Sequence, residues 1–246
     1  MQRSILFLAP LLLFLCLPAT KPQGANGMTA PQGKVYGEWR IRVRPDKGAQ
    51  YDELIRSQGV PLFKAAGGRM VGWWKTQIGD LYEQLTIWEY DNMAAFQRAV
   101  EQLGSDQKFA EFAAQRDPLL SGEESRFLRL GPQAIAPKLH EPAPFVIHEI
   151  HRVRLADLSS YLEYMQTKGL PMLHQHGFSP VGPLVVDVGD SSEVTYLFRF
   201  ESLAERERLI AEFSQKRAYQ DYSRELAARC QQVVTRLLVP AAAMRE

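Results

Sequence analysis

The sequence repeats itself once, and this repeat limits the possible folds more than any other feature. Several turn motifs and small residues recur 110 positions later: Gly59-Val60-Pro61 as Gly169-Leu170-Pro171, Gly67 as Gly177, Val71-Gly72 as Val181-Gly182, Gly79-Asp80 as Gly189-Asp190 and Ala94 as Ala204. Chance seldom preserves both identity and spacing, so two copies of one structural unit are expected. A one-residue slip is expected only near the start, where Glu38 would match Glu149.

Within each copy, the period of the apolar residues changes in the same order. The first copy predicts a strand over 35–44 and then a helix that begins at Tyr51, is disturbed by Gly59 and Pro61, and ends at Gly67-Gly68. Two strands follow, over 69–78 and 84–90, joined by a turn at Gly79-Asp80. Apolar residues at helical spacing over 93–103 and 109–112 predict further helix up to Pro118, and the last strand is predicted over 125–130. The second copy predicts strands near 145–154, 181–188, 194–200 and 233–239, and helices near 157–175 and 202–230.

This order, β-α-β-β-α-β, is that of the ferredoxin-like unit. Its helices cover one face of the sheet, so the other face needs a partner, which a second copy can supply. We therefore predict an α+β fold with a first domain over 34–130 and a diverged second domain over 145–240. The intervening residues, 131–144, contain four prolines and no usable period, which indicates a linker.

The first 27 residues are expected to lie outside the fold. Arg3 precedes an almost unbroken apolar run over 5–19, which is typical of a signal peptide and predicts secretion or export to the periplasm. A membrane anchor is the weaker alternative, because the run is shorter than the roughly 20 residues of a spanning helix and Pro10 interrupts it. Translation from Met28 would instead leave the protein in the cytoplasm. No integral membrane domain is expected.

Charge, cysteines and motifs exclude several classes of protein. The 29 Lys and Arg residues are interspersed with 28 Asp and Glu, so no nucleic acid partner is expected. Loss of the leader removes Cys16 and leaves Cys230 without an intrachain disulfide partner. Cys230 is expected on the last helix, where Arg229 could lower the pKa of its thiol, but no His is adjacent and a lone helical Cys is usually a packing residue. Phosphate loops, dinucleotide turns, nucleophile elbows and Cys-x-x-Cys pairs are missing from the sequence, and no cofactor is predicted.

The first copy resembles the NIPSNAP family, whose domain belongs to the dimeric α+β barrel superfamily. The matching segments are Glu38-Trp39-Arg40, the run Gly67-Gly68-Arg69-Met70-Val71-Gly72-Trp73-Trp74, Ile78-Gly79-Asp80-Leu81, and Leu85-Thr86-Ile87-Trp88-Glu89-Tyr90. The second copy resembles a diverged NIPSNAP domain, with Phe198 at the position of Trp88 and Pro183 at that of Trp73. The resemblance implies that the two tandem ferredoxin-like units form a pseudo-dimeric α+β barrel. It brings no established set of catalytic residues.

Aromatic residues concentrate on the second and third predicted strands of the first copy: Trp73, Trp74, Tyr82, Trp88 and Tyr90. In the superfamily that this chain resembles, the cleft between sheet and helices often holds a flat hydrophobic ligand, and aromatic walls suit such a ligand. The simpler interpretation is core packing, which must bury most of these rings in so small a unit.

Charged residues spaced two apart lie on one strand face in each copy: Glu38 with Arg40, and Glu149 with His151. They are either polar ligand contacts or ion pairs that hold the sheets together, and we favour ion pairs. His148 and His151 should lie on opposite strand faces, and His174 and His176 are about 200° apart on a helix. No metal site is therefore predicted.

We hypothesise that the protein binds a small apolar molecule or a protein partner through the barrel and its aromatic cleft. Trp73, Trp88 and Tyr90 are the candidate walls, and Arg40, Glu38 and His176 are the candidate polar contacts. A cofactor-independent monooxygenase acting on an aromatic substrate, with His176, Trp73 and Glu38 as first suspects, is the alternative suggested by superfamily relatives. A purely structural interaction module is a third, and self-association into a homo-oligomer is compatible with all three.

Overall fold

A computed structural model describes residues 33–135 and 140–241, so the predicted leader lies outside the described residues. The first half contains β1 (Val35–Val43), α1 (Gly48–Leu54), η2 (Ile55–Gly59), α2 (Val60–Ala65), β2 (Arg69–Ile78), β3 (Glu83–Tyr90), α3 (Met93–Ser105), α4 (Gln107–Arg116), η3 (Asp117–Leu119) and β4 (Leu120–Ile135). The second half contains β5 (Phe145–Val153), η4 (Leu155–Asp157), α5 (Leu158–Tyr164), η5 (Met165–Gly169), α6 (Leu170–Gln175), β6 (Pro180–Val188), β7 (Glu193–Phe200), α7 (Leu203–Ser214), α8 (Arg217–Arg229) and β8 (Cys230–Pro240).

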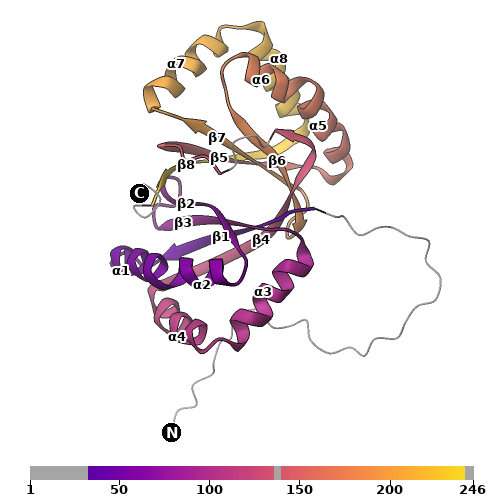
Figure 1. Cartoon of the computed structure of the whole chain (residues 1–246). Helices are drawn as coiled ribbons and strands as arrows, with labels where there is room; N and C mark the ends of the chain where they lie inside the picture. Colours follow the sequence, from indigo (N-terminus) through magenta and orange to yellow (C-terminus); the bar gives the residue numbers. More distant parts are fainter. Residues whose placement is uncertain (1–32, 136–139, 242–246) are drawn as a thin grey trace, which may run out of the picture. The chain divides into compact units, whose positions relative to one another are not determined.

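The strands form one closed antiparallel barrel in the order β1-β3-β2-β8-β5-β7-β6-β4. Two junctions, β2 with β8 and β4 with β6, join strands of different halves and so close the barrel. Figure 1 shows α1 to α4 on the outside of the first-half strands and α5 to α8 on the outside of the second-half strands. The predicted pair of ferredoxin-like units in one α+β barrel is confirmed.

Each strand alternates between the barrel interior and the helix layer, as its period of two requires. On β2, Trp74 belongs to the apolar cluster inside the barrel, whereas its neighbour Trp73 packs under the helices with Ile41 and Phe112. The helix-facing sides of the two halves form separate clusters, one of which is built around Tyr161 and Phe213. The fold therefore has an apolar layer inside the barrel and one between strands and helices in each half.

The register shows that the predicted slip between the copies is wrong. Glu38 lies opposite Ile87, and His148 lies opposite Leu197. Ile87 and Leu197 are 110 positions apart, so the structural equivalent of Glu38 is His148 rather than Glu149. Glu38 and Glu149 are both glutamates but are not equivalent, because the second half carries a histidine at the position of Glu38.

A π-helical turn interrupts the first helix of each half, at the glycine and proline that the sequence predicts to disturb this helix. In η2, the turn precedes Pro61, which has no backbone N–H to donate to the residue four positions earlier. Gly59 ends this turn, and an added Cβ would lie 3.2 Å from the Phe112 ring and 3.3 Å from Ile55. The glycine therefore allows the helix to approach α4 closely.

Three predicted boundaries differ from the structure. The expected helix over 202–230 is two helices, because Lys216 adopts an extended conformation between α7 and α8. Cys230, expected on a helix, is the first residue of β8. Strand β4 continues into the predicted linker, where Ile135 pairs with Gly182 after a register shift. In the described part of the chain, every helix falls short of the length and apolarity that a membrane crossing requires.

Candidate functional site

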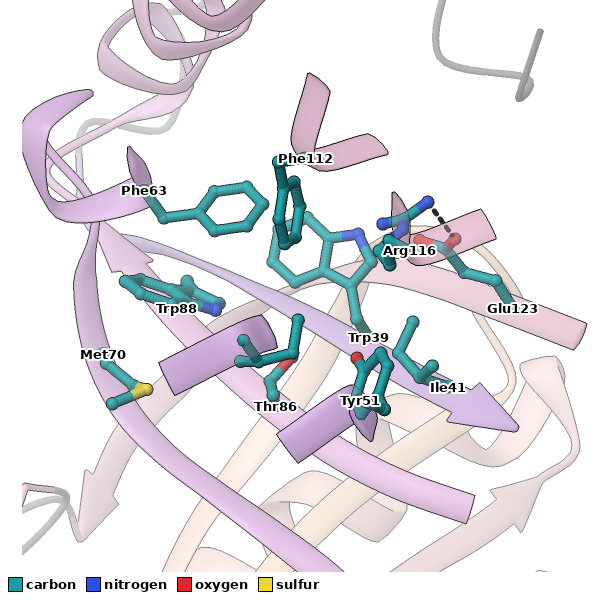
Figure 2. A pocket seen from close by; sticks show the side chains of 11 residues that line it. Trp39, Ile41, Tyr51, Phe63, Met70, Thr86, Trp88, Phe112, Arg116 and Glu123 are labelled. Carbon is teal, nitrogen blue, oxygen red and sulfur yellow. Dashed lines mark hydrogen bonds and ion pairs between the residues drawn. The ribbon is translucent and has the colours of Figure 1, made fainter. Parts of the chain in front are cut away.

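A pocket of about 50 Å³ lies between the helices and the strands of the first half (Figure 2). Its walls are mostly rings and aliphatic side chains: Trp39 and Ile41 from β1, Phe63 from α2, Trp88 from β3 and Phe112 from α4. The rings pack against one another: the centroid of the Phe63 ring lies 5.2 Å from that of Trp88 and 6.4 Å from that of Phe112. A single water needs about 10–15 Å³ and a cavity that holds benzene about 150 Å³, so the pocket has room for a few waters and must widen to admit a ring-sized ligand.

The helix period and the strand period together place the side chains around the pocket. Tyr51 and Ile55 are four residues apart across the junction of α1 and η2, so both project from one helix face. Thr86 and Trp88 are two residues apart on β3, so both face the helices. The π-helical turn begins at Ile55, which places the irregular part of the helix at the pocket wall.

Three polar atoms of the pocket have no hydrogen-bond partner among the described residues: Tyr51 Oη, Thr86 Oγ1 and Trp88 Nε1. All three side chains are largely buried and line the same pocket in Figure 2, but their polar atoms keep some accessible surface. Burial raises the pKa of Tyr51, so its hydroxyl stays protonated and can donate a hydrogen bond. The pocket thus combines apolar walls with hydroxyl and indole N–H groups that make no hydrogen bond to the described part of the protein.

Two ion pairs that share Arg116 lie at the border of the pocket. Arg116 Nη2 lies 3.0 Å from Glu123 Oε2 and 3.0 Å from Asp117 Oδ1. Because both carboxylates are paired with this one guanidinium, Arg116 is not available as a free cation for an anionic ligand. A neutral molecule suits these surroundings better than an ion.

The structure separates the predicted ligand residues. Trp88 lines the pocket, and Tyr90, on the same face of β3, packs behind it against Phe96 at 5.3 Å. Trp73 faces the helix layer but is outside the pocket, with its Nε1 donating to Gln84 Oε1 at 2.6 Å. His176 lies in the second half, stacked on Phe213 at 4.8 Å.

Glu38 and Arg40 point into the barrel, on the opposite side of the sheet from the pocket. Glu38 is fully buried, where it accepts a hydrogen bond from Arg126 Nε at 2.9 Å and lies 3.3 Å from His148 Nε2. Burial alone would raise the pKa of its carboxyl, but Arg126 and His148 outweigh this effect and hold the pKa below its usual range. The favoured interpretation, an ion pair between the sheets, agrees with this position.

Several pocket residues were not among the predicted ones, notably Trp39, Tyr51, Phe63 and Phe112. Their helical spacing or strand alternation was visible in the sequence. Such patterns assign a residue to the helix-facing layer, however, and do not tell a filled layer from a hollow one.

The other candidate chemistries also have clear positions. His148 faces the barrel interior and His151 the helix layer, as strand alternation predicts. Among residues 33–135 and 140–241, no group of three or more His, Cys, Asp or Glu side chains is arranged to hold a metal ion. Burial raises the pKa of the Cys230 thiol to about 11 and outweighs Arg229, which agrees with the favoured packing role of this residue.

Sequence comparison identifies the family. The NIPSNAP family profile matches residues 38–134 and 150–244, one segment for each half of the barrel. The chain therefore belongs to the NIPSNAP family and carries two tandem copies of its domain. No curated protein matches the chain.

Solved structures share the whole barrel. A proposed monooxygenase from Fusobacterium nucleatum has a TM-score of 0.63 at 11% identity, over 86% of this chain and 94% of its own. One from Lactobacillus acidophilus has a TM-score of 0.60 at 11% identity, over 85% and 95%. An anthrone oxidase-like protein has a TM-score of 0.59 at 12% identity, over 85% and 91%. At these identities, the likeness establishes the fold alone.

Proposed function

We propose that the first half binds a small, flat, largely apolar molecule that carries a hydroxyl or carbonyl oxygen. The observation that supports this is the set of polar atoms of Tyr51, Thr86 and Trp88, which belong to a ring-lined pocket and make no hydrogen bond within the described residues. A hydrogen bond of this kind contributes about 0.5–1.5 kcal/mol. A ligand oxygen can take it from the Tyr51 or Thr86 hydroxyl, and the rings supply the apolar contact.

A size-matched pair of ligands tests this proposal. Phenol and toluene have the same ring and differ in replacing a hydroxyl by a methyl group. We expect calorimetric titration to show tighter binding of phenol, and the variant Tyr51→Phe to reduce that preference by about tenfold or less, the effect of one hydrogen bond. Equal affinity for both ligands in the wild type contradicts the proposal.

A second candidate is a cofactor-independent monooxygenase, which the three barrel structures named above favour by their own descriptions. In such a reaction, an electron-rich anthrone takes up O₂ and yields the anthraquinone and water. The pocket supplies apolar walls and a neutral phenol at Tyr51 that can hydrogen-bond the substrate oxygen, but its volume of about 50 Å³ requires a large opening before three rings can enter. Oxygen uptake with anthrone tests this candidate, and a rate equal to that of buffer alone rejects it.

A further inference from the structure

Four buried polar atoms lie on neighbouring strands inside the barrel and make no hydrogen bond to the residues that the structure describes. They are Thr76 Oγ1, Glu83 Oε1, His148 Nδ1 and Arg236 Nη1. Their strands, β3, β2, β8 and β5, are consecutive neighbours in the barrel. Polar atoms that are removed from solvent are nearly always hydrogen-bonded, so these four indicate a further bonding partner.

Strand pairing places the four side chains next to one another. Thr76 and Glu83 adjoin the end of the β2–β3 ladder, on the faces of their strands that point into the barrel. Arg236 Nε lies 2.9 Å from Glu83 Oε1, and Arg236 is directly opposite His148 in the β5–β8 ladder. A Cβ added to Gly79 would lie 3.3 Å from Arg236 Cγ and 3.2 Å from Thr76 Cγ2, so these two side chains are also close. The four polar groups therefore surround one region, on the opposite side of the sheet from the ring-lined pocket.

At the position related by the repeat, the protein's own side chains bond one another. Arg126 is the equivalent of Arg236, and it donates hydrogen bonds to three side chains, Glu38, Glu193 and Thr195. In the region around Arg236, His148 stands in place of Glu38 and Leu85 in place of Thr195. Arg236 therefore keeps one carboxylate partner among the described residues, Glu83, where Arg126 has two.

Two of the four atoms accept hydrogen bonds and two donate them. Burial lowers the pKa of His148, so its ring is neutral at neutral pH. Its Nε2 lies 3.3 Å from Glu38 Oε2, and a carboxylate only accepts, so the ring proton is on Nε2 and Nδ1 is an acceptor. The carboxylate oxygen of Glu83 is the second acceptor, while the guanidinium of Arg236 and the hydroxyl of Thr76 are donors.

We propose that this region is a binding site for one ordered water molecule that bridges the two halves of the barrel. The water accepts hydrogen bonds from Arg236 Nη1 and the Thr76 hydroxyl, and it donates to His148 Nδ1 and Glu83 Oε1. This set matches the equal donor and acceptor capacity of water, and buried waters typically make about three hydrogen bonds. An anion would meet two acceptors and a cation would meet a guanidinium, so a neutral molecule fits best.

The water is part of the junction between the halves. Thr76 and Glu83 belong to first-half strands, whereas His148 and Arg236 belong to second-half strands. A buried water that bonds such groups is a fixed part of a fold and is costly to remove. The protein thus uses a water beside Arg236 where it uses its own side chains beside Arg126.

A high-resolution crystal structure of the full chain tests the proposal directly. We expect a water oxygen at hydrogen-bond distance, about 2.7–3.2 Å, from both His148 Nδ1 and Arg236 Nη1. A structure in which no water lies within that distance of both atoms overturns the proposal.

Magnetic relaxation dispersion of water, which counts long-lived internal waters, tests it in solution. In His148→Glu, the new carboxylate should bond Arg236 directly, as Glu38 bonds its equivalent, so the count should fall by one water. Thr76→Val removes one of four partners and should shorten the residence time of the water by up to about tenfold, the effect of one hydrogen bond. The matched control Thr235→Val, exposed on the outer face of β8, should change neither quantity. An equal count in wild type and folded His148→Glu, or an unchanged residence time in Thr76→Val, overturns the proposal.

Discussion

Glu38 and His148 occupy equivalent positions in the two halves and contact each other, with His148 Nε2 3.3 Å from Glu38 Oε2. Equivalent residues of two copies meet only where the axis that relates the copies passes between them. The same symmetry relates two ion pairs across the halves, Arg126 with Glu193 and Arg236 with Glu83. A buried charged network therefore joins the two sheets at their pseudo-twofold axis.

Removal of one member of this network should destabilise the fold strongly. In Glu38→Ala, Arg126 and His148 lose their shared carboxylate inside the barrel. Breaking a buried ion pair costs about 3–5 kcal/mol, and we expect the free energy of unfolding to fall by that amount in denaturant titrations.

The control for this variant is Glu124→Ala, because Glu124 pairs with Arg40 at the surface and its side chain is 64% exposed. An exposed pair contributes about 0–1 kcal/mol. Equal losses in Glu38→Ala and Glu124→Ala contradict the structural role assigned to the network.

The same carboxylate should make stability depend on pH. The pKa of Glu38 in the folded state lies below its ordinary value of 4.5, so the folded protein binds fewer protons than the unfolded chain at acidic pH. Its contribution is complete above pH 4.5 and is lost progressively as the pH falls below that value. Glu38→Gln should flatten the pH dependence below pH 4.5 by up to about 1.4 kcal/mol per pH unit. An unchanged slope shows that the pKa of Glu38 is not lowered by folding.

The close approach at Gly59 predicts a sharp difference between two glycine substitutions. In Gly59→Ala, the new Cβ meets Phe112 and Ile55 at 3.2 and 3.3 Å, and both residues line the pocket. Overpacking of this kind costs about 1–3 kcal/mol. Gly104→Ala, in exposed helical surroundings with no atom within 4 Å, should instead stabilise the protein by about 0.5–1 kcal/mol. Thermal unfolding of both variants measures the difference, and a destabilised Gly104→Ala contradicts it.

The signal-peptide prediction concerns residues outside the described part of the chain. We propose that the mature protein is exported and begins near residue 20, because the apolar run after Arg3 is typical of a cleaved leader; a chain that begins at Met28 instead agrees with a late translation start. Intact mass of the protein from its own host measures this directly. A mass that includes Met1 and the apolar run contradicts cleavage.

The sequence predicted the architecture well because turns and periods are local properties. Gly79-Asp80 and Gly189-Asp190 mark the hairpins, and alternation at Trp73 and Trp74 separates the two sheet faces. The repeat then implied the second sheet that closes the barrel.

The site was harder to predict because it depends on which side chains face each other across layers. Glu38 and Arg40 look like ligand contacts on a strand, yet they face the barrel interior. Tyr51 and Tyr161 occupy the same place in the repeat, but one faces a cavity and the other a histidine. Only the packed structure distinguishes these cases.

The most direct test of the central claim is to fill the pocket of the first half and measure phenol binding by calorimetry. Thr86→Tyr places at the pocket the side chain that Tyr196 provides in the second half. We expect wild type and the buried control Thr76→Val, on strand β2 next to β8, to bind phenol alike and Thr86→Tyr to lose binding while it still unfolds cooperatively. Undiminished binding by folded Thr86→Tyr would show that the ligand site lies elsewhere.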